Sequence, residues 1–195
     1  SRAASTYDSA AQLQRDVGTR LLQLLDDRHS GDRSINAKTI LDLGCGTGLC
    51  GELFKGMARE LIGIDVSQQM IDIATHKNIY DQLIAGDIRE SINNFHGIDM
   101  ILAADVLTYI GDLENLFKNI TTALQVGGLF TFTVEKTSQQ SYILQRNIRY
   151  AHSKIYLEAV IAQNQFDVLR FDNIVLRKQQ GKPVAGFLVT LKKSL

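Results

Sequence analysis

Three alternating glycines stand directly after a short apolar run that contains one acidic residue. The run is Ile40-Leu41-Asp42-Leu43, and the turn after it is Gly44-Cys45-Gly46-Thr47-Gly48. The run fits a buried parallel strand, while glycines permit positive φ and let a ligand approach the bare backbone. Apolar residues at helical spacing follow at positions 49, 53, 54 and 57. A strand, a glycine turn and a helix start in this order are typical of a nucleotide-type cofactor site, with amide N–H groups directed at the ligand.

Two classes of cofactor use this architecture, and the register of the strand separates them. The stretch from Gly46 to Gly51 satisfies the dinucleotide pattern G-x-G-x-x-G, and Asp65 follows at a distance suited to a ribose carboxylate. In that pattern the strand runs straight into the first glycine, whereas here the chain already turns at Gly44. The string Asp-Leu-Gly-Cys-Gly-Thr-Gly resembles instead motif I of the class I S-adenosylmethionine (SAM)-dependent methyltransferases. The resemblance implies SAM as the cofactor and S-adenosylhomocysteine as its product, with a dinucleotide oxidoreductase as the alternative.

Acidic residues follow three further apolar segments in the order that this family shows. They are Asp65, Asp87 and Asp105. A carboxylate at the end of a strand can accept hydrogen bonds from both ribose hydroxyls, and the resemblance gives that role to Asp65. It places Asp87 and Ile88 at the adenine, and Asp105 near the reacting methyl group. Without the resemblance, the same acids would be explained as turn or helix-capping residues.

The resemblance places SAM across the carboxyl edge of the first two strands, with the glycine turn at its amino-acid end. The cofactor contacts that it implies are Asp42, Gly44, Cys45, Gly46, Gly48, Asp65, Val66, Met70, Gly86, Asp87, Ile88 and Ala104. The candidate catalytic residues are Tyr7, Asp105 and His152, each of which could act as a base toward an amine or hydroxyl acceptor. No metal site is predicted.

The N-terminal end carries a second resemblance. Residues 7–25 fit one amphipathic helix whose apolar stripe suits core packing. Residues 1–15 resemble the N-terminus of the malonyl-acyl carrier protein O-methyltransferases of biotin synthesis, in which this segment folds over the cofactor with a tyrosine, here Tyr7, near the methyl group. We therefore expect residues 1–27 to form a helical lid that excludes water and brings aromatic surface to the sulfonium. An exposed aromatic at a helix start is the plainer interpretation of Tyr7.

The C-terminal half points to a different relative. Residues 132–193 resemble the methyltransferase domain of predicted proteins that attach it to tetratricopeptide repeats. We expect residues 136–165 to form a substrate-side insertion and a helix, with Arg149 and His152 beside the pocket. A basic pair there would suit an anionic group such as a carboxylate, although a surface arginine and a helix-start histidine explain the same residues. Residues 166–191 predict a final hairpin that supplies a reversed edge strand.

The composition indicates how many domains the chain forms and which classes of partner it is expected to bind. With 195 residues, 45% of them hydrophobic, the chain can bury one substantial core, so a single domain over residues 1–195 is expected. The formal charge is zero without a block of Lys or Arg, which argues against nucleic acid as a partner. The chain shows no membrane-spanning run and no signal-peptide pattern, so no membrane partner is expected. Cys45 and Cys50 fit reduced packing residues, which favours a cytoplasmic protein.

These observations predict an α/β fold, a Rossmann-like doubly wound sheet of about seven strands with a reversed C-terminal edge strand. The fourth strand ends in Ala103-Ala104-Asp105-Val106 and lacks the Asn/Asp-Pro-Pro-aromatic motif that holds an exocyclic base nitrogen, which argues against DNA amino-methylation. We predict SAM-dependent O-methylation of a carboxylate, with malonyl-acyl carrier protein in biotin synthesis as the leading acceptor. The alternatives are a methyltransferase for another small molecule or a protein side chain, and a non-catalytic SAM-binding module. The oligomeric state is left open.

Overall fold

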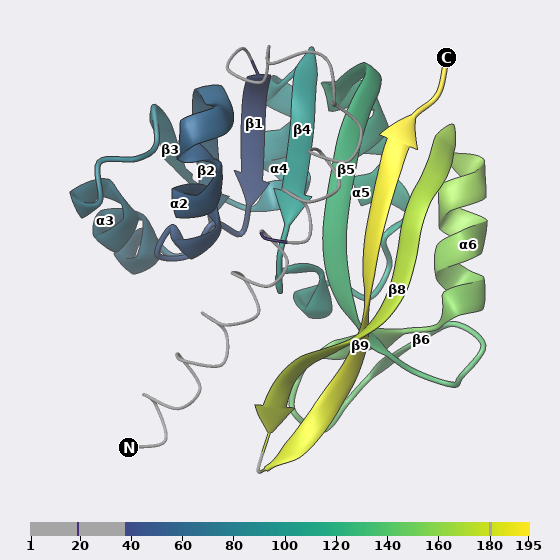
Figure 1. Ribbon diagram of the computed structural model, residues 1–195. Coiled ribbons are helices and arrows are strands. Elements are labelled where there is room, and N and C mark those ends of the chain that lie inside the picture. The colour runs from purple at the N-terminus through teal and green to yellow at the C-terminus, as the bar shows by residue number, and fades with distance from the viewer. Residues whose placement is uncertain (1–18, 20–37, 180) are drawn as a thin grey trace.

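The computed structural model describes residues 19, 38–179 and 181–195 (Figure 1). Its centre is a nine-stranded sheet whose main path follows the order β3-β2-β1-β4-β5-β7-β6. Tyr7 and, apart from residue 19, the predicted lid lie outside the described residues. The strands are β1 (Lys38–Leu43), β2 (Ala58–Asp65), β3 (Gln82–Ala85), β4 (Ile98–Ala103), β5 (Leu124–Lys136), β6 (Tyr142–Leu144), β7 (Tyr150–His152), β8 (Phe166–Gln179) and β9 (Lys182–Lys193).

The strand β1 lies in the middle of the parallel part of the sheet because it is apolar on both faces. Ile40, Leu41 and Leu43 are fully buried, and β1 pairs in parallel with β2 on one side and with β4 on the other. Such burial on both faces produces the continuous apolar run seen in the sequence.

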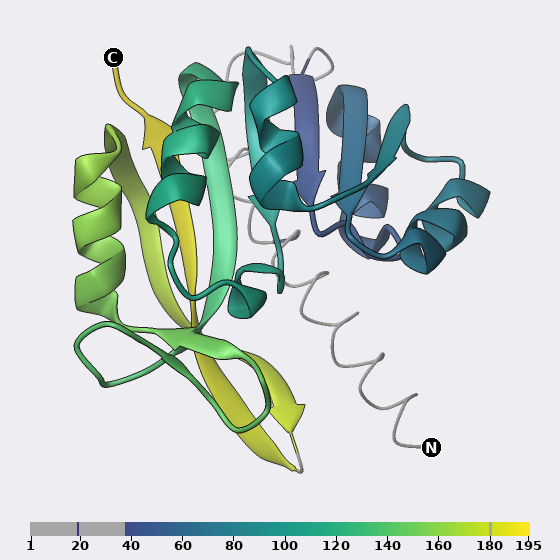
Figure 2. The same cartoon turned by 180° about the vertical axis from the view of Figure 1, so that it is seen from behind.

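Helices cover both faces of the sheet, as the predicted doubly wound architecture requires. Phe54 of α2 belongs to one core cluster and Phe117 of α5 to the other, on the opposite face (Figures 1 and 2). In the described part of the chain, no helix is both long and apolar enough to cross a bilayer. The helices are α2 (Leu49–Phe54), α3 (Gln68–His76), α4 (Ile88–Ser91), α5 (Glu114–Ala123) and α6 (Lys154–Gln163), with 3-10 turns η2 (Lys55–Met57), η3 (Ile92–Asn94) and η4 (Leu107–Tyr109).

The last strand runs against its neighbours, as predicted, but it is not at the edge. The strand β9 is antiparallel to β5 along residues 129–135 and to β8 along nearly its whole length. The outermost position on this side is therefore taken by β8. The ends of β8 and β9 continue beyond the sheet as a long hairpin (Figure 1).

The short strands β6 and β7 raise the strand count above the predicted seven. The pairing of β4 with β5 ends at Ala103 and Phe132. The strand β7 then pairs in parallel with β5 at Glu135 and Lys136, and β6 pairs antiparallel with β7. This hairpin brings the segment after β5 back toward the carboxyl ends of the parallel strands.

Candidate active site

A cavity of about 510 Å³ opens at the carboxyl ends of β1, β2 and β4. Sites for small molecules typically enclose about 300–1,000 Å³. The loops that follow parallel strands meet at one edge of the sheet, so residues far apart in the sequence line the same wall. The predicted residues on this wall are Gly44, Gly46, Asp65, Val66, Met70, Asp87, Ile88, Ala104, Asp105 and Arg149.

The glycine turn has the expected backbone, but only one of its glycines faces open space. The φ angles are 68°, 54° and 86° at Gly44, Gly46 and Gly48, all in the left-handed region. A Cβ atom at Gly44 would collide with Val106, and one at Gly48 would press on Tyr80, whereas nothing lies within 4 Å of a Cβ at Gly46. The room for a ligand to approach the backbone is therefore at Gly46, and Gly48 packs away from the cavity wall.

Four amide groups of this turn donate hydrogen bonds within the protein. The N–H groups of Gly44 and Cys45 both donate to the carbonyl oxygen of Ile64, at 2.8 and 3.0 Å. The Gly46 N–H donates to Asp65 Oδ2 at 2.9 Å. The Gly48 N–H donates to the Cys45 carbonyl oxygen at 2.9 Å. These four N–H groups are therefore already paired with acceptors of the protein.

Asp65 stands at the end of β2 and joins the two loops beside the cavity. Its Oδ2 accepts from Gly46 N, and its Oδ1 accepts from Ser67 N at 2.9 Å. Each carboxylate oxygen can accept a second hydrogen bond, so both can still receive ribose hydroxyls. Val66 beside it is 78% exposed and, with Met70 of α3, supplies apolar surface to the wall.

Asp87 is both a helix cap and a wall residue. Its Oδ1 accepts from the backbone N–H of Arg89 at 2.9 Å, and the Arg89 guanidinium pairs with both carboxylate oxygens. This hydrogen bonding lowers the pKa of Asp87 below its usual range, so the carboxylate is ionised. Ile88 lies next to it on the wall. Gly86 is not on the wall, and its N–H donates to the Asp65 carbonyl oxygen at 2.9 Å.

Asp42 and Cys45, which are predicted to contact the cofactor, lie behind the glycine turn and do not line the cavity. Asp42 Oδ2 accepts from the Tyr80 hydroxyl at 2.7 Å. Burial raises the pKa of Asp42 to about 7, against the opposing effect of this hydrogen bond. Burial likewise raises the pKa of the Cys45 thiol. Asp42 and Cys45 therefore stabilise the glycine turn from the side away from the cavity.

At the far end of the cavity, Arg149 lies beside Asp105 and Tyr109. Its Nη1 donates to Asp105 Oδ1 at 3.0 Å, and its Nη2 donates to the Tyr109 hydroxyl at 2.9 Å. The guanidinium also lies over the Tyr109 ring, 4.9 Å from its centre. A guanidinium carries five N–H donors, so donors remain for a further anionic group. The turn between β6 and β7 supplies this cation to the wall.

Asp105, Glu135, Arg149 and Arg177 form an ionic cluster behind this end of the cavity, which we call the arginine–carboxylate cluster. Arg177 of β8 donates to Asp105 Oδ1 at 3.2 Å and pairs with Glu135 Oε1. The side chains of Arg177 and Glu135 are 7% and 3% exposed. Asp105 has φ of 59°, and its N–H donates to Thr133 Oγ1 at 2.9 Å. Because Asp105 Oδ1 accepts from both arginines, Asp105 positions Arg149 and is not a free base.

The chain shares its fold and part of its sequence with methyltransferases. Magnesium protoporphyrin IX methyltransferase from Synechocystis, solved with bound SAM, superposes with a TM-score of 0.68 at 15% identity, covering 93% of this chain and 79% of that one. Residues 41–132 match the family model of the methyltransferase domain. The malonyl-[acyl-carrier protein] O-methyltransferase of Yersinia pestis is 31% identical over 133 residues, which are 68% of this chain and 47% of that protein.

Residues 41–132 form a methyltransferase domain, and the chain has the fold of the SAM-dependent methyltransferases. A second relative, the mitochondrial ubiquinone biosynthesis O-methyltransferase of Rattus norvegicus, is 32% identical over 125 residues, which are 60% of this chain and 36% of that protein. The chain spans about half the length of the malonyl-[acyl-carrier protein] relatives that it matches. SAM is the cofactor of this family, and the motif resemblance found in the sequence is confirmed.

His152, which is predicted as a candidate base, is packed in the interior. The side chain is fully buried, and its Nε2 lies 3.0 Å from the carbonyl oxygen of Gly111. The ring packs against Tyr142 and Tyr156, and burial lowers its pKa. His152 does not line the cavity.

Several wall residues of the methyltransferase were not predicted from the sequence. Arg89 lies in the four-residue helix α4 and Tyr109 in the 3-10 turn η4, and neither segment has a recognisable sequence pattern. Arg177 is 72 residues from Asp105 in the chain, and its inward direction depends on register shifts in β8. Two residues gave a signal for this end of the cavity: Asp105, predicted near the reacting methyl group, and Arg149, predicted as one of a basic pair. The other unpredicted wall residues are Thr47, Leu49, Ser67, Val106 and Ile110.

Proposed function

We propose that this methyltransferase transfers the methyl group of SAM to a carboxylate oxygen, and that the acceptor is the malonyl group of malonyl-acyl carrier protein in biotin synthesis. The observation that carries the proposal is the position of Arg149. It shares one cavity with Asp65 and the glycine turn, so a cation lies on the wall across from the cofactor residues. The positive charge of Arg149 therefore matches the negative charge of a carboxylate acceptor.

The cofactor side of the cavity suits each part of SAM. Asp65 would accept from the ribose hydroxyls, since its oxygens retain acceptor capacity. Asp87 would accept from the adenine amino group, and Ile88 would cover the ring. The turn at Gly46 offers an open backbone to the amino-acid end.

The residues at the acceptor end would orient and hold rather than exchange protons. A carboxylate is already ionised at neutral pH and needs no general base. Arg149 would fix the acceptor by charge-assisted hydrogen bonds, and Asp105 would keep Arg149 in place. When bound, SAM would supply the methyl group from its sulfonium, and the products would be a methyl ester and S-adenosylhomocysteine.

The relatives support this assignment. Proteins named malonyl-[acyl-carrier protein] O-methyltransferase from Yersinia pestis and Serratia marcescens are 31% and 30% identical to the chain, each over 133 residues. A bifunctional biotin biosynthesis protein of Saccharophagus degradans is 25% identical over 193 residues, which are 97% of this chain.

The test is transfer of labelled methyl from SAM to malonyl-loaded carrier protein, with the unloaded carrier as control. We expect label on the malonyl carrier alone. We also expect Arg149→Gln to raise the KM for this acceptor about tenfold or more, because a charge-assisted hydrogen bond contributes about 1.5–3 kcal/mol. The same variant should leave SAM affinity unchanged. Equal labelling of both carriers, or an unchanged KM, would contradict the proposal.

Two alternatives make different predictions in the same assay. A methyltransferase for another small molecule or a protein side chain would bind SAM, ignore the malonyl carrier and methylate a component of an acceptor screen. A non-catalytic module would bind SAM and methylate nothing. The cation of Arg149 at the acceptor end of the cavity supports a carboxylate acceptor.

A further inference from the structure

Two stretches of the C-terminal half contain basic but no acidic residues, although the whole chain has a formal net charge of zero. Residues 136–157 contain four Lys or Arg, residues 173–195 contain five, and neither range contains Asp or Glu. The first range includes β6 and β7, and the second includes β9 and the end of β8. The hairpins made from these strands lie together at the lower end of the molecule, below the sheet (Figures 1 and 2).

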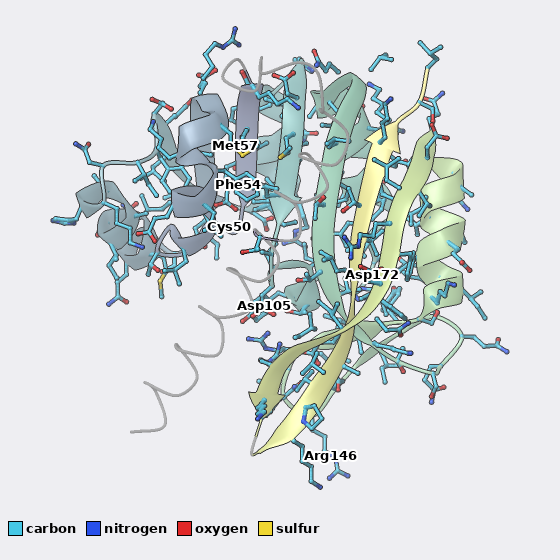
Figure 3. All side chains as sticks on the ribbon, in the orientation of Figure 1. Cys50, Phe54, Met57, Asp105, Arg146 and Asp172 are labelled. Atoms are coloured by element: carbon cyan, nitrogen blue, oxygen red, sulfur yellow. The ribbon has the colours of Figure 1, made fainter. Side chains whose placement is uncertain are left out.

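Three exposed cations stand at this end, and we call Arg146, Lys178 and Lys182 the basic tip. Arg146 lies in the turn after β6, and the two lysines flank the turn between β8 and β9. Arg146 is placed beyond Asp105 toward that turn (Figure 3). Among the described residues, no carboxylate forms an ion pair with any of the three. Their charge is therefore available to a partner.

The turn that carries Arg146 also carries Arg149, so the basic tip is continuous with the acceptor end of the cavity. The Gln145 N–H donates to the Arg149 carbonyl oxygen at 2.9 Å, which closes the turn. The Gln145 side chain donates to Glu135 Oε2 at 2.6 Å, and Asn147 Nδ2 donates to Gln179 Oε1 at 3.4 Å. These bonds tie the turn to the arginine–carboxylate cluster on one side and to the β8–β9 hairpin on the other.

Apolar side chains accompany the cations on this surface. Ile148 is 78% exposed, and Leu144 is 57% exposed. Cations interspersed with exposed aliphatic groups suit a folded acidic protein, which offers both carboxylates and apolar surface. A long nucleic acid would need a longer track of cations to its phosphates.

We propose that the basic tip, with Ile148 and Leu144, docks an acidic carrier protein and thereby delivers the carrier's tethered acceptor to Arg149. This inference rests on the proposed function and adds to it the surface that the carrier contacts. Charges at the rim of an interface mainly accelerate association and make it sensitive to salt. A small acceptor without a carrier enters the cavity without touching this surface.

The test compares two acceptors that bear the same malonyl group, one on the carrier protein and one on free pantetheine. The test variant is Arg146→Glu/Lys182→Glu. The matched control is Lys118→Glu/Lys192→Glu, which makes the same charge change at exposed positions on α5 and at the opposite end of β9. We expect the test variant to lower kcat/KM for the carrier-bound acceptor about tenfold or more at low salt, in the range of electrostatic steering. It should leave kcat/KM for malonyl-pantetheine unchanged, and the control should leave both unchanged.

The outcomes separate this inference from the proposed function. Methylation of both acceptors, with equal salt dependence and no effect of the test variant, would overturn the docking surface and leave the proposed function standing. Methylation of neither acceptor, with SAM still bound, would contradict the proposed function itself. If short duplex DNA binds the wild-type chain but not the test variant, while kcat/KM for the carrier is unaffected, the surface serves nucleic acid and the proposal is wrong.

Discussion

Asp65 connects the two loops that form the cofactor side of the cavity. One carboxylate oxygen accepts from the Gly46 N–H of the glycine turn, and the other accepts from the Ser67 N–H at the start of α3. A single side chain thus determines both the shape of the turn and the acceptors offered to a ribose. Substitution at this position should therefore affect binding more than the fold, provided that one oxygen acceptor is kept.

We predict that Asp65→Asn raises the Kd for SAM about tenfold or more, because hydrogen bonds to a charged group contribute about 1.5–3 kcal/mol. Calorimetric titration with SAM measures the change, and NAD serves as a second ligand that should not bind the wild type. Asp99→Asn is the matched control, since Asp99 accepts from Thr39 N at the start of β1, at the other edge of the sheet. Unchanged SAM affinity in Asp65→Asn would mean that the ribose site lies elsewhere.

At the scale of elements, the arginine–carboxylate cluster joins segments that the sheet alone leaves apart. Arg177 comes from β8, Glu135 from β5, Asp105 from the loop after β4 and Arg149 from the turn before β7. Breaking a buried ion pair by removing one partner leaves an uncompensated charge in a poorly solvated place. The cluster is therefore expected to control both stability and the position of Arg149.

We predict that Arg177→Met lowers the free energy of unfolding by about 3 kcal/mol, within the range for removing one partner of a buried pair. The double variant Arg177→Met/Glu135→Gln should recover part of this loss. Arg170→Met, on the same strand, removes a pair whose side chains are both 31% exposed, and should cost less than about 1 kcal/mol. Urea unfolding measures all three variants. Equal losses of the free energy of unfolding in Arg177→Met and Arg170→Met would show that the buried cluster contributes no more to stability than an exposed ion pair.

The parallel part of the sheet could be predicted because its signals are local. The apolar run of β1, the glycine turn and the acids after β2 and β3 each lie within a few residues, and the structure places Asp65 and Asp87 on the wall. Gly51, the last glycine of the match to G-x-G-x-x-G, is explained by packing, because the Tyr80 ring occupies the space that a Cβ at this position would need. The hairpin β6–β7 could not be predicted because its strands have three residues each.

At the scale of the whole molecule, the site has a cofactor side that could be predicted from the sequence and an acceptor end that largely could not. The cofactor side comes from β1 to β4 and the loops after them, whereas the acceptor end needs contacts between β5, β7 and β8. Such contacts join residues 42 to 72 positions apart, as in the pairs of Arg177 with Glu135 and with Asp105. The acceptor end therefore becomes visible only when the fold is known.

The stability of the whole molecule should depend on pH through Asp42. In the unfolded chain its carboxyl ionises near a pKa of about 4, whereas burial raises the folded value to about 7. Between these values the folded state keeps a proton that the unfolded state has lost, so this contribution to the free energy of unfolding falls as pH rises from about 4 to about 7.

We predict that Asp42→Asn, which keeps an oxygen acceptor for Tyr80, gains about 4 kcal/mol relative to the wild type between pH 4 and pH 8. Urea unfolding of both proteins across this range measures the difference. A difference that stays constant with pH would show that Asp42 ionises normally in the folded protein.

The measurement that tests the account most directly compares three forms of the carrier protein, loaded with malonyl, loaded with acetyl and unloaded, with labelled SAM as the methyl source. These acceptors differ in whether they present a free carboxylate to Arg149. The account predicts label on the malonyl-loaded carrier alone, released by mild base as expected of a methyl ester. Label on the acetyl-loaded or unloaded carrier, or label that resists base, would contradict methyl transfer to a carboxylate.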